Sequence, residues 1–545
     1  MASTLTINGQ GVAEFDILNV RSTLILNGQN VSQLLGNQLN QIVGVRWDTS
    51  SSSPDLVRVD RMGNTITPAP TFFDLHPTWG GMRRCVMNDA GAVTAYQGDA
   101  GFAVDGSAGQ VMVEVPKFYY LVKDIGVYRY FWISPIEAPG FKVHPMFIRD
   151  SVEMDYAYIG AFEASVYDVT ASATELDTIT VTAGASASGN LTITLDGTYA
   201  FTVAVAAGDS DATVAGKIRS EGNKTDYQGV VWTVGGSGAT VTYTASDAGL
   251  KHTVAVAAAS TGVTTTIVKT TPGAGGYALN DPAGYVLTAT TGDKLASIAG
   301  VKPATGWKNE TLYLPAFRQL AQNRGAGWGL LSFNQLCGVQ LLYLIEYATF
   351  DSQTALSVGV TNITDDAVTN MAVNTGVTAG VGTGASNLAN ASGQVSITHY
   401  ATAQTTTPFS YRGIENLYGN ANTWVDGINI KADNNPWIAD HDFASDTFAH
   451  PYADTGLTLP TISGYPTALV NVPAVDHSFL PSVVGGTGSQ TKYTCDYYYQ
   501  AAGNRAALIG GRWYHAGSAG AFYLNCAYAA AIAYRFVGAR LARSG

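Results

Sequence analysis

The chain is divided by an abrupt change of composition. Between Val169 and about Thr271, Thr, Ala, Val and Gly dominate and aromatic residues nearly vanish, and an aromatic-bearing sequence resumes at Gly276. Segments such as NLTITLDG and AFTVAVAAG alternate apolar and polar residues, which is typical of half-buried strands. One short helix is predicted at SDATVAGKIRS, with Ser210 or Asp211 as its N-cap. We therefore predict a small β-sandwich over 169–271, inserted into a domain that starts before it and finishes after it.

The sequence before the insertion is rich in predicted strands. In GQVMVEVPKFYYLV, the residues Val111, Val113 and Val115 alternate with polar or outward-facing positions. The segments YRYFWIS and AYIGAFEASVYD follow the same pattern, and proline and glycine separate them. Residues 46–168 are predicted to form a β-rich domain that leads into the domain of residues 272–545.

Two helices are predicted after the insertion. YLPAFRQLAQNRG has Pro315 in its first turn and Gly325 as a stop signal. SFNQLCGVQLLYLIEYATF begins with Ser332 and Gln335 at capping-box spacing. Its residues are apolar on nearly all sides, so it is predicted to be a core helix. The Gly/Thr/Asn/Ala-rich sequence of residues 357–393 predicts a long irregular loop, a feature that is often functional.

Residues 1–45 are predicted to be an attachment and oligomerisation segment. TLTINGQ at Thr4–Gln10 recurs as TLILNGQ at Thr23–Gln29, and each copy ends in the tight-turn signal Asn-Gly. Such small units cannot bury a core alone, so they need copies from other subunits or a docking surface. The apolar spacing of VSQLLGNQLNQIVGV predicts a short helix, which packs either against symmetry mates or on the next domain.

Charge is scarce in this chain. Only 13% of the residues are charged, against about 25% in an average globular domain. The surface is therefore either covered by small polar residues or partly buried between subunits. For the second case we expect a homotrimer. A net charge of −12 without any Lys/Arg run argues against nucleic acid as a partner.

Neither export nor redox chemistry is indicated. No signal peptide and no stretch of about 20 apolar residues is present, so synthesis in a cytoplasm without membrane insertion is expected. The four cysteines form no CxxC pair and no metal-ligand spacing with histidine. They are expected to be buried free thiols.

The last residues, from Ala507 to Gly545, carry the most distinctive composition. ALIGGRWYHAGSAGAFYLNCAYAAAIAYRFVGARLARSG mixes tyrosine with glycine, alanine and small polar residues. Tyrosine beside small polar residues is typical of adaptable binding surfaces, because it offers rigid amphipathic area at low entropic cost. We therefore expect a displayed face here. Strand alternation turns about half of these side chains inward.

Together with an upstream segment, this ending resembles a known family. YRGIENLYGNANTWVDGINI contains a GN, then a TW-V-x-G, and the ending contains GG-x-W and G-x-R-L-A. The pair resembles the C-type-lectin-like fold of the formylglycine-generating-enzyme type, and is most similar to phage receptor-binding tail proteins, including those diversified by retroelements. The resemblance implies a mainly β protein with an α+β, C-type-lectin-like C-terminal domain. The inserted sandwich resembles the immunoglobulin-like modules of phage tail and fibre proteins.

The resemblance also assigns roles to residues of the ending. It implies a frame of Gly510, Gly511, Trp513, Gly538, Arg540 and Leu541, in which Trp513 and Arg540 are expected to be structural. The receptor-binding residues are then expected among the tyrosines and polar residues between and before them, namely Tyr498, Tyr514, His515, Ser518, Phe522, Tyr523, Asn525 and Tyr528. The rings of Tyr514, His515, Phe522 and Tyr523 are expected to be exposed.

Catalysis is not expected. The family's enzymes use two cysteines, whose matching positions here are His515 and Gly520, so neither a cofactor nor a metal ion is expected. Two alternative activities, glycan cleavage and metal binding, have candidate residues in this sequence. Glu415, Asp426 and Asp496 offer carboxylates for glycan cleavage, and ADHDF at Ala439–Phe443 offers a weak metal-binding pattern.

The predicted function is attachment of a phage to its host. The chain is expected to be a tail fibre or tip protein of the virion that is assembled in the host cytoplasm. It contacts other tail or baseplate proteins and binds a host cell-surface protein or glycan through its C-terminal face. The alternatives are a structural head or tail fibre without a defined receptor and a polysaccharide-degrading tail enzyme.

Overall fold

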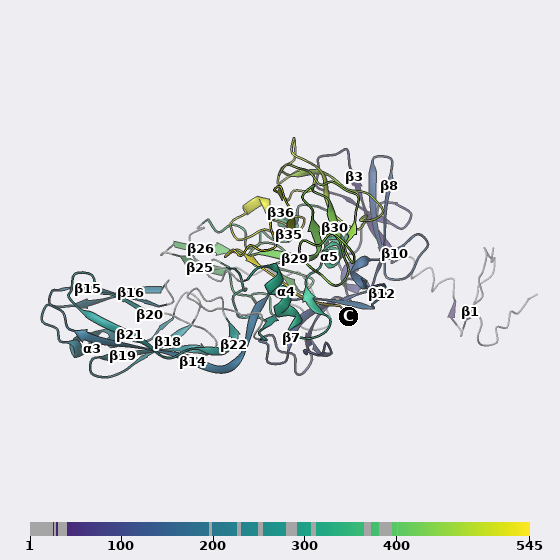
Figure 1. Ribbon diagram of the computed structural model, residues 1–545. Helices are drawn as coiled ribbons and strands as arrows, with labels where there is room; N and C mark the ends of the chain where they lie inside the picture. The colour runs from purple at the N-terminus through teal and green to yellow at the C-terminus, as the bar shows by residue number, and fades with distance from the viewer. Residues whose placement is uncertain are drawn as a thin grey trace, which may run out of the picture.

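The structure is a computed structural model, and it describes residues 25–26, 29–30, 41–195, 199–225, 230–248, 254–278, 292–306, 312–364, 372–380, 395–399 and 402–544. This part of the chain is mainly β, with several antiparallel sheets and few helices, as the sequence predicted. Figure 1 shows a main body from which one elongated module projects to the left. No helix in the described ranges is long and apolar enough to cross a lipid bilayer.

Three larger sheets build the main body. The first has the strand order β10 (Lys142–Val143), β8 (Tyr119–Ile125), β9 (Tyr128–Ser134), β3 (Val43–Asp48) and β4 (Val57–Asp60). The second has the order β24 (Trp328–Leu330), β38 (Leu541–Ser544), β13 (Tyr156–Gly160), β7 (Gln110–Pro116), β5 (Arg83–Met87) and β6 (Val93–Tyr96). The third has the order β31 (Ala453–Asp454), β30 (Pro436–Ile438), β29 (Asn422–Ile430), β35 (Arg505–Ile509), β36 (Leu524–Tyr528) and β34 (Tyr498–Gln500), with β37 (Val537–Gly538) beside β29.

Several short hairpins complete the body. They are β11 (Ile148–Arg149) with β12 (Val152–Glu153), β25 (Val395–His399) with β26 (Thr402–Thr406), β27 (Ser410–Tyr411) with β28 (Ile414–Glu415), and β32 (Pro466–Leu469) with β33 (Pro481–Val484). The short helical turns are α2 (Phe72–Leu75), η1 (Pro145–Phe147), α6 (Ser352–Ala355) and η3 (Ala516–Ser518).

The chain closes on its own first half. The strand β38 lies between β13 and β24, with Tyr158 and Trp328 both opposite Arg543. This pairing joins strands whose residues are several hundred positions apart in the sequence. The second sheet is therefore complete only when the last strand has been added.

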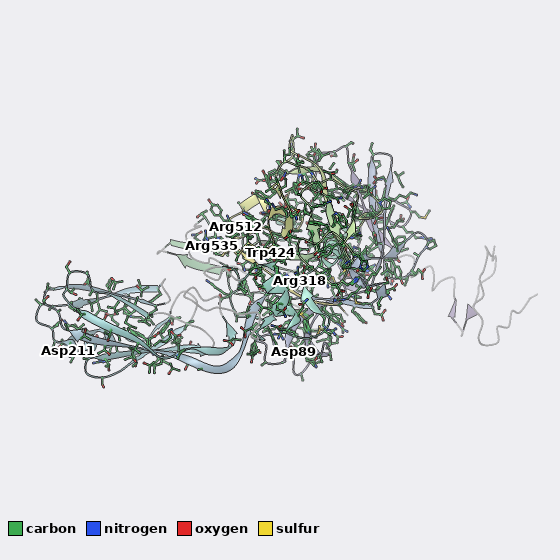
Figure 2. All side chains as sticks on the ribbon, in the orientation of Figure 1. Asp89, Asp211, Arg318, Trp424, Arg512 and Arg535 are labelled. Carbon is green, nitrogen blue, oxygen red and sulfur yellow. The ribbon has the colours of Figure 1, made fainter. Side chains whose placement is uncertain are left out.

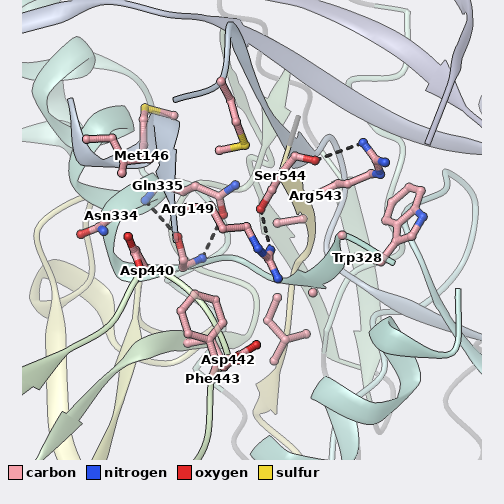
Figure 3. Close-up of a pocket in the computed structure, with 18 of the residues that line it drawn as sticks. Met146, Arg149, Trp328, Asn334, Gln335, Asp440, Asp442, Phe443, Arg543 and Ser544 are labelled. Atoms are coloured by element: carbon pink, nitrogen blue, oxygen red, sulfur yellow. Dashed lines mark hydrogen bonds between the residues drawn. The ribbon is translucent and has the colours of Figure 1, made fainter. Parts of the chain in front are cut away.

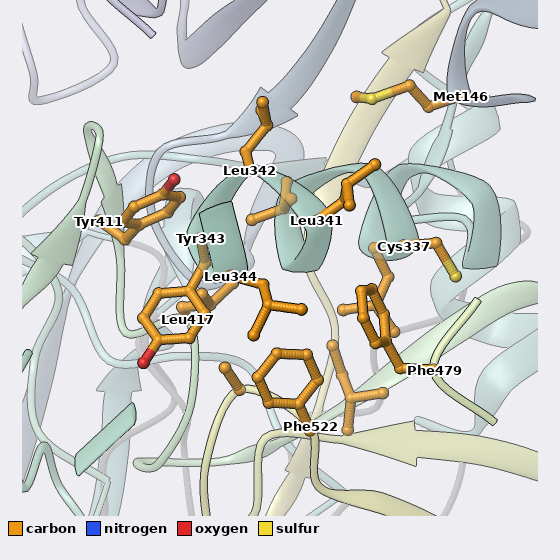
Figure 4. Packing of buried hydrophobic residues seen from close by; sticks show 14 of the residues in the cluster. Met146, Cys337, Leu341, Leu342, Tyr343, Leu344, Tyr411, Leu417, Phe479 and Phe522 are labelled. Atoms are coloured by element: carbon orange, nitrogen blue, oxygen red, sulfur yellow. The ribbon is translucent and has the colours of Figure 1, made fainter. Parts of the chain in front are cut away.

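The helix α5 (Phe333–Tyr347) lies in the centre of the main core (Figure 4). It begins with the predicted capping box, in which the Ser332 hydroxyl accepts from the Gln335 N–H and the Gln335 side chain accepts from the Ser332 N–H. It ends at Ala348, which has a left-handed conformation (φ 54°). All residues from Phe333 to Glu346 are buried, which confirms the prediction of a core helix.

A second core lies around the helix α4 (Leu314–Gln322). Pro315 occupies its first turn as predicted, and the chain leaves the helix towards Gly325, whose φ is +131°. Its apolar face packs with Trp424 of β29 and Leu541 of β38. The four cysteines are buried and free, as expected.

The projecting module is a sandwich of two sheets with its own core. One sheet has the order β17 (Lys224–Thr225), β18 (Val231–Gly235), β19 (Thr240–Ala248), β14 (Ser165–Ala183) and β21 (Thr264–Thr271), and the other has β16 (Tyr199–Val205), β15 (Gly189–Leu195) and β20 (Val254–Ala257). The helix α3 (Asp211–Ser220) is capped by Ser210 and buries Val214 and Ile218 in the same core. Residues of both sheets and of α3 form this separate cluster.

An antiparallel ribbon connects the module to the body. The strand β14 leaves the body, where it pairs with β22 (Ala274–Ala278) and β23 (Lys294–Ala296), and continues into the module. The returning strand β21 lies beside it, with Leu176 opposite Thr271. Entry and exit are therefore neighbours, which is the geometry that tolerates an inserted domain.

Two predictions for the first half need correction. The apolar spacing of VSQLLGNQLNQIVGV predicts a helix that includes Val43, but Val43 begins β3, because Val43, Val45 and Trp47 point towards the core as alternate residues of a strand. In β7 the alternating valines do not face outward-pointing neighbours, because Met112 and Glu114 are buried as well. The copy at 4–10 and residues 31–40 lie outside the described residues, whereas the second copy contributes the pair β1 (Ile25–Leu26) and β2 (Gln29–Asn30).

Candidate functional site

The predicted receptor-binding residues are divided between the core and the surface. Tyr514 is exposed (46%), and His515, Ser518 and Tyr528 are partly exposed. The remaining residues of the set are buried, and these are Tyr498, Phe522, Tyr523 and Asn525. The expectation that the rings of Phe522 and Tyr523 are exposed is therefore wrong.

Phe522 is buried because its segment turns into the main core. Its ring packs edge-on against Phe350 and Phe479, at centroid distances of 5.0 Å in both cases. Its N–H donates to the carboxyl group of Asp496 (2.7 Å). Burial raises the pKa of Asp496 well above its usual range. This carboxyl group thus holds the chain segment in place from beneath the surface.

The run Tyr497, Tyr498, Tyr499 shows how alternation sorts the tyrosines. Tyr498 is buried, and its hydroxyl donates to the Pro460 carbonyl oxygen (3.1 Å). Tyr497 and Tyr499 point the other way and remain partly exposed. The sequence predicted that this run contributes to the receptor-binding surface. Of its three tyrosines, however, the predicted contact residue Tyr498 is the one that points inward.

Partly exposed aromatic side chains from four segments form two groups of ring contacts, which together we call the aromatic face. Its members are Tyr465, Tyr497, Tyr499, His515, Tyr528, Tyr534 and Phe536. Ring centroids of successive members lie 4.5–6.0 Å apart within two chains of contacts, Tyr465 to His515 and Tyr528 to Phe536. The buried ring of Tyr523 lies beneath them, 5.8 Å from Tyr499 and 5.3 Å from His515.

Two arginines, Arg512 and Arg535, contact aromatic rings of this region (labelled in Figure 2). The guanidinium of Arg512 lies over the ring of Phe536 (3.7 Å), and that of Arg535 lies near the ring of Trp513 (5.9 Å). Segments 512–513 and 535–536 therefore clasp each other through reciprocal cation–π contacts. Burial, with a smaller contribution from the charge of Arg512, lowers the pKa of His515 to about 3, so this ring is neutral at physiological pH.

The face rests on a rigid frame of glycines and buried side chains. Gly510 and Gly511 both have φ values of +80°, and a Cβ on Gly511 would lie 2.7 Å from that of Ala519. Trp513 is fully buried against Val360, Ile363 and Val373 of the long loop. Its burial agrees with the structural role that the resemblance implied.

Arg540 and Glu163 form a second, polar part of this frame. Arg540 is buried and donates to the carbonyl oxygens of Gly160 (2.9 Å), Glu415 (2.7 Å) and Asn416 (2.9 Å). Glu163 accepts from the side-chain amides of Asn416 (3.0 Å) and Asn420 (2.5 Å). Burial raises the pKa of Glu163 to about 7. The sequence reasoning missed this group, although two asparagines and glycine in NLYGN are a signal for strained turns, and both asparagines have positive φ.

The carboxylates considered for glycan cleavage are buried. Glu415 accepts from the N–H groups of Gly376 and Thr378 (2.7 Å each), so it fixes the described part of the long loop. Asp426 forms a bidentate ion pair with Arg318 (2.8 and 2.6 Å). Together with Asp496 they serve as internal hydrogen-bond and ion-pair partners rather than as a pair at the aromatic face.

The ADHDF segment forms a small ionic cluster. Asp440 Oδ1 lies 2.5 Å from His441 Nδ1, and Asp150 lies 3.7 Å from Nε2 of the same ring. Among the described residues, no group of three or more His, Cys, Asp or Glu side chains is arranged to hold a metal ion.

A scan against protein-family models and a search of curated protein sequences both gave no match.

Proposed function

We propose that the chain is a receptor-binding protein of a phage tail, either a fibre or a tip. It attaches the virion to a host cell-surface protein or glycan through the aromatic face. The observation that carries this proposal is the presence of two groups of partly exposed tyrosines in contact with one another, on a buried frame. Tyrosine loses little rotamer entropy on binding and offers both apolar area and a hydroxyl group.

The frame supports this role. Binding is stronger when the contact residues are already held in place, because less ordering is needed on association. Here glycines with positive φ, the buried Trp513 and the hydrogen bonds of Arg540 fix the segments that carry the aromatic rings. No step of this function requires catalysis.

The finer description of the fold belongs to the same proposal. The pairing of the final strand β38 with β13 and the helix α5 beneath the third sheet suit a C-type-lectin-like domain. The module suits an immunoglobulin-like insertion, and the N-terminal residues suit attachment to the virion and assembly of a homotrimer. A homotrimer would multiply weak contacts by avidity. Light scattering on the purified chain should therefore give three times the mass of one chain.

The function is tested by binding of the labelled full chain to a panel of bacterial strains. Tyr499→Ala and Tyr534→Ala should each weaken binding to a susceptible strain by tenfold or more, as expected for aromatic contact residues. The matched control is Tyr156→Ala, because Tyr156 and Tyr534 are both 42% exposed but Tyr156 lies on β13, outside the aromatic face. Equal binding by all three variants would contradict the proposal and favour a structural fibre protein.

A further inference from the structure

A pocket of about 80 Å³ lies apart from the aromatic face, between the hairpin β11–β12, the start of α5, the strand β38 and the loop after β30 (Figure 3). Its volume is several times the minimum that one water molecule requires. Its apolar lining includes Met146, Trp328 and Phe443. The rest of the wall is polar, so the pocket combines apolar surface with hydrogen-bonding groups.

The first turn of α5 supplies donors to this pocket. The side chains of Asn334 and Gln335 both line it, although they are only 7% and 6% exposed. Their oxygen atoms are engaged, since Asn334 Oδ1 lies 3.1 Å from His477 Nε2 and Gln335 Oε1 accepts from Ser332 N–H (3.0 Å). Their nitrogen atoms, Nδ2 and Nε2, have no hydrogen-bond partner among the described residues. Two nearly buried amide donors are thus left for a ligand.

Charge at this end of the pocket favours an anion. α5 has 15 residues, so its N-terminus carries the positive end of a substantial helix dipole. Arg149 lies beside it and uses Nη1 to bond the Ser544 hydroxyl (2.7 Å). Arg543 donates to the Ser544 carbonyl oxygen (3.0 Å). Figure 3 shows the Gln335 side chain on the side of Arg149, whereas the Asn334 side chain points away from it. Arg149, the Gln335 amide and the N-terminus of α5 therefore line one part of the pocket.

The pocket is also lined by three acidic residues, Asp426, Asp440 and Asp442. Asp426 is neutralised by its bidentate pair with Arg318. Asp440 is hydrogen-bonded to His441, and this contact raises the pKa of the histidine. Asp442 is exposed on the loop after β30. These carboxylates leave the donors at the start of α5 available.

We propose that this pocket binds the carboxylate group of a small organic acid. The guanidinium of Arg149 and the amide of Gln335 hold the two oxygens, and the apolar part of the lining receives the carbon skeleton. Arginine and planar amides match a carboxylate because they offer parallel N–H donors. The site is independent of the aromatic face, so its failure would leave the proposed function untouched.

The test is calorimetric titration of the full chain with acetate and with D-galacturonate, each beside its neutral partner, acetamide or D-galactose. We expect at least one acid to bind with a stoichiometry of one per chain and a millimolar dissociation constant, and neither neutral compound to bind. Gln335→Glu is the most informative variant. Glutamate is a natural residue of the capping box, so it keeps the bond to Ser332 N–H, but it replaces the amide donor with negative charge. Binding should weaken by tenfold or more.

Two further variants complete the experiment. Arg149→Gln should also weaken binding by tenfold or more. Gln319→Glu is the matched control, because it makes the same chemical change at an exposed position of α4 outside the pocket, and it should bind like the wild type. Absence of binding by both acids, equal binding of the neutral compounds, or unchanged affinity in Gln335→Glu would each overturn the proposal.

Discussion

The inserted module and the C-terminal segment are stabilised in different ways. The module buries one face of each sheet in a core of its own, and its strands pair with one another between Leu176 and Thr271. The C-terminal segment instead depends on distant partners, since β38 pairs with β13 and Arg540 bonds carbonyl oxygens near residues 160 and 415. Damage to the module should therefore stay local, whereas damage to the C-terminal segment should affect the whole body.

The largest expected effect comes from removing a buried tryptophan on each side of this comparison. Trp513→Ala should destabilise the body by about 3–5 kcal/mol, because it leaves a cavity against Val360 and Val373. Trp232→Ala should do the same to the module core. Calorimetry should show each change lowering one thermal transition and leaving the other in place. Movement of both transitions in either variant would mean that the two regions unfold as one unit.

Within the C-terminal segment, two tyrosines close in sequence should respond differently. Tyr523→Ala should lower the free energy of unfolding of the body by about 3 kcal/mol, because the ring is fully buried and its hydroxyl accepts from Asn525. Tyr534→Ala should change it by no more than about 0.5 kcal/mol, since the ring is 42% exposed. Urea unfolding measures both values. Similar losses in the two variants would show that the aromatic face is part of the core.

Acid should distinguish the body from the module. Burial lowers the pKa of His477 to about 4, whereas in the unfolded chain it has its ordinary value near 6.5. The unfolded state therefore takes up the proton first. The stability contributed by the neutral ring is complete above about pH 6.5 and is lost as the pH falls towards 4.

This loss should amount to about 2 kcal/mol between pH 7 and pH 5 from His477 alone. Urea unfolding at pH 7 and pH 5 measures how much the free energy of unfolding of the body falls between the two values. In His477→Gln, this fall should be smaller than in the wild type by about 2 kcal/mol. The exposed His450→Gln is the control and should leave the drop unchanged. An unchanged drop in His477→Gln would contradict the assignment.

The smallest expected effect is that of deleting the module. Joining Leu176 to Thr271 with a short Gly/Ser linker replaces residues 177–270 and keeps the paired base of the ribbon. Because the module has a separate core, the melting temperature of the body should change by only a few degrees. A soluble, folded product with an unchanged C-terminal transition is the expected result. Loss of folded protein would show that the body requires the module.

Local signals were sufficient for much of the fold. Ser210, Ser332 with Gln335, and Pro315 predicted the starts of the helices α3, α5 and α4, because a cap or a first-turn proline acts on its own backbone. Alternation predicted the module strands because one face of each sheet meets solvent, as in the buried Leu191, Ile193 and Leu195 of β15. The same rule failed for β7 and β29, where both faces of the strand are covered and nearly all residues are buried.

The candidate site was predictable only in part. The composition of the ending indicated an aromatic surface, but not which rings form it. Tyr465 directly precedes the strand β32 and comes well before the C-terminal residues in the sequence. Phe536 is positioned by its cation–π contact with Arg512. The carboxylate pocket gave no signal at all, because Arg149, Gln335 and Ser544 lie far apart in the sequence and converge only in the folded chain.

The sequence by itself determined a mainly β chain with an interrupted body, capped helices and a C-terminal segment rich in tyrosine. These properties depend on neighbouring residues, and short-range periodicity and capping are written in consecutive positions. Only the tertiary structure decided which side of each strand faces solvent. Tyr497 and Tyr499 reach the surface, while Tyr498 between them pairs with Leu524 and points into the core. Alternation means that neighbouring side chains of a strand point to opposite faces of the sheet. Which of the two faces is buried depends on the layer that packs against the sheet.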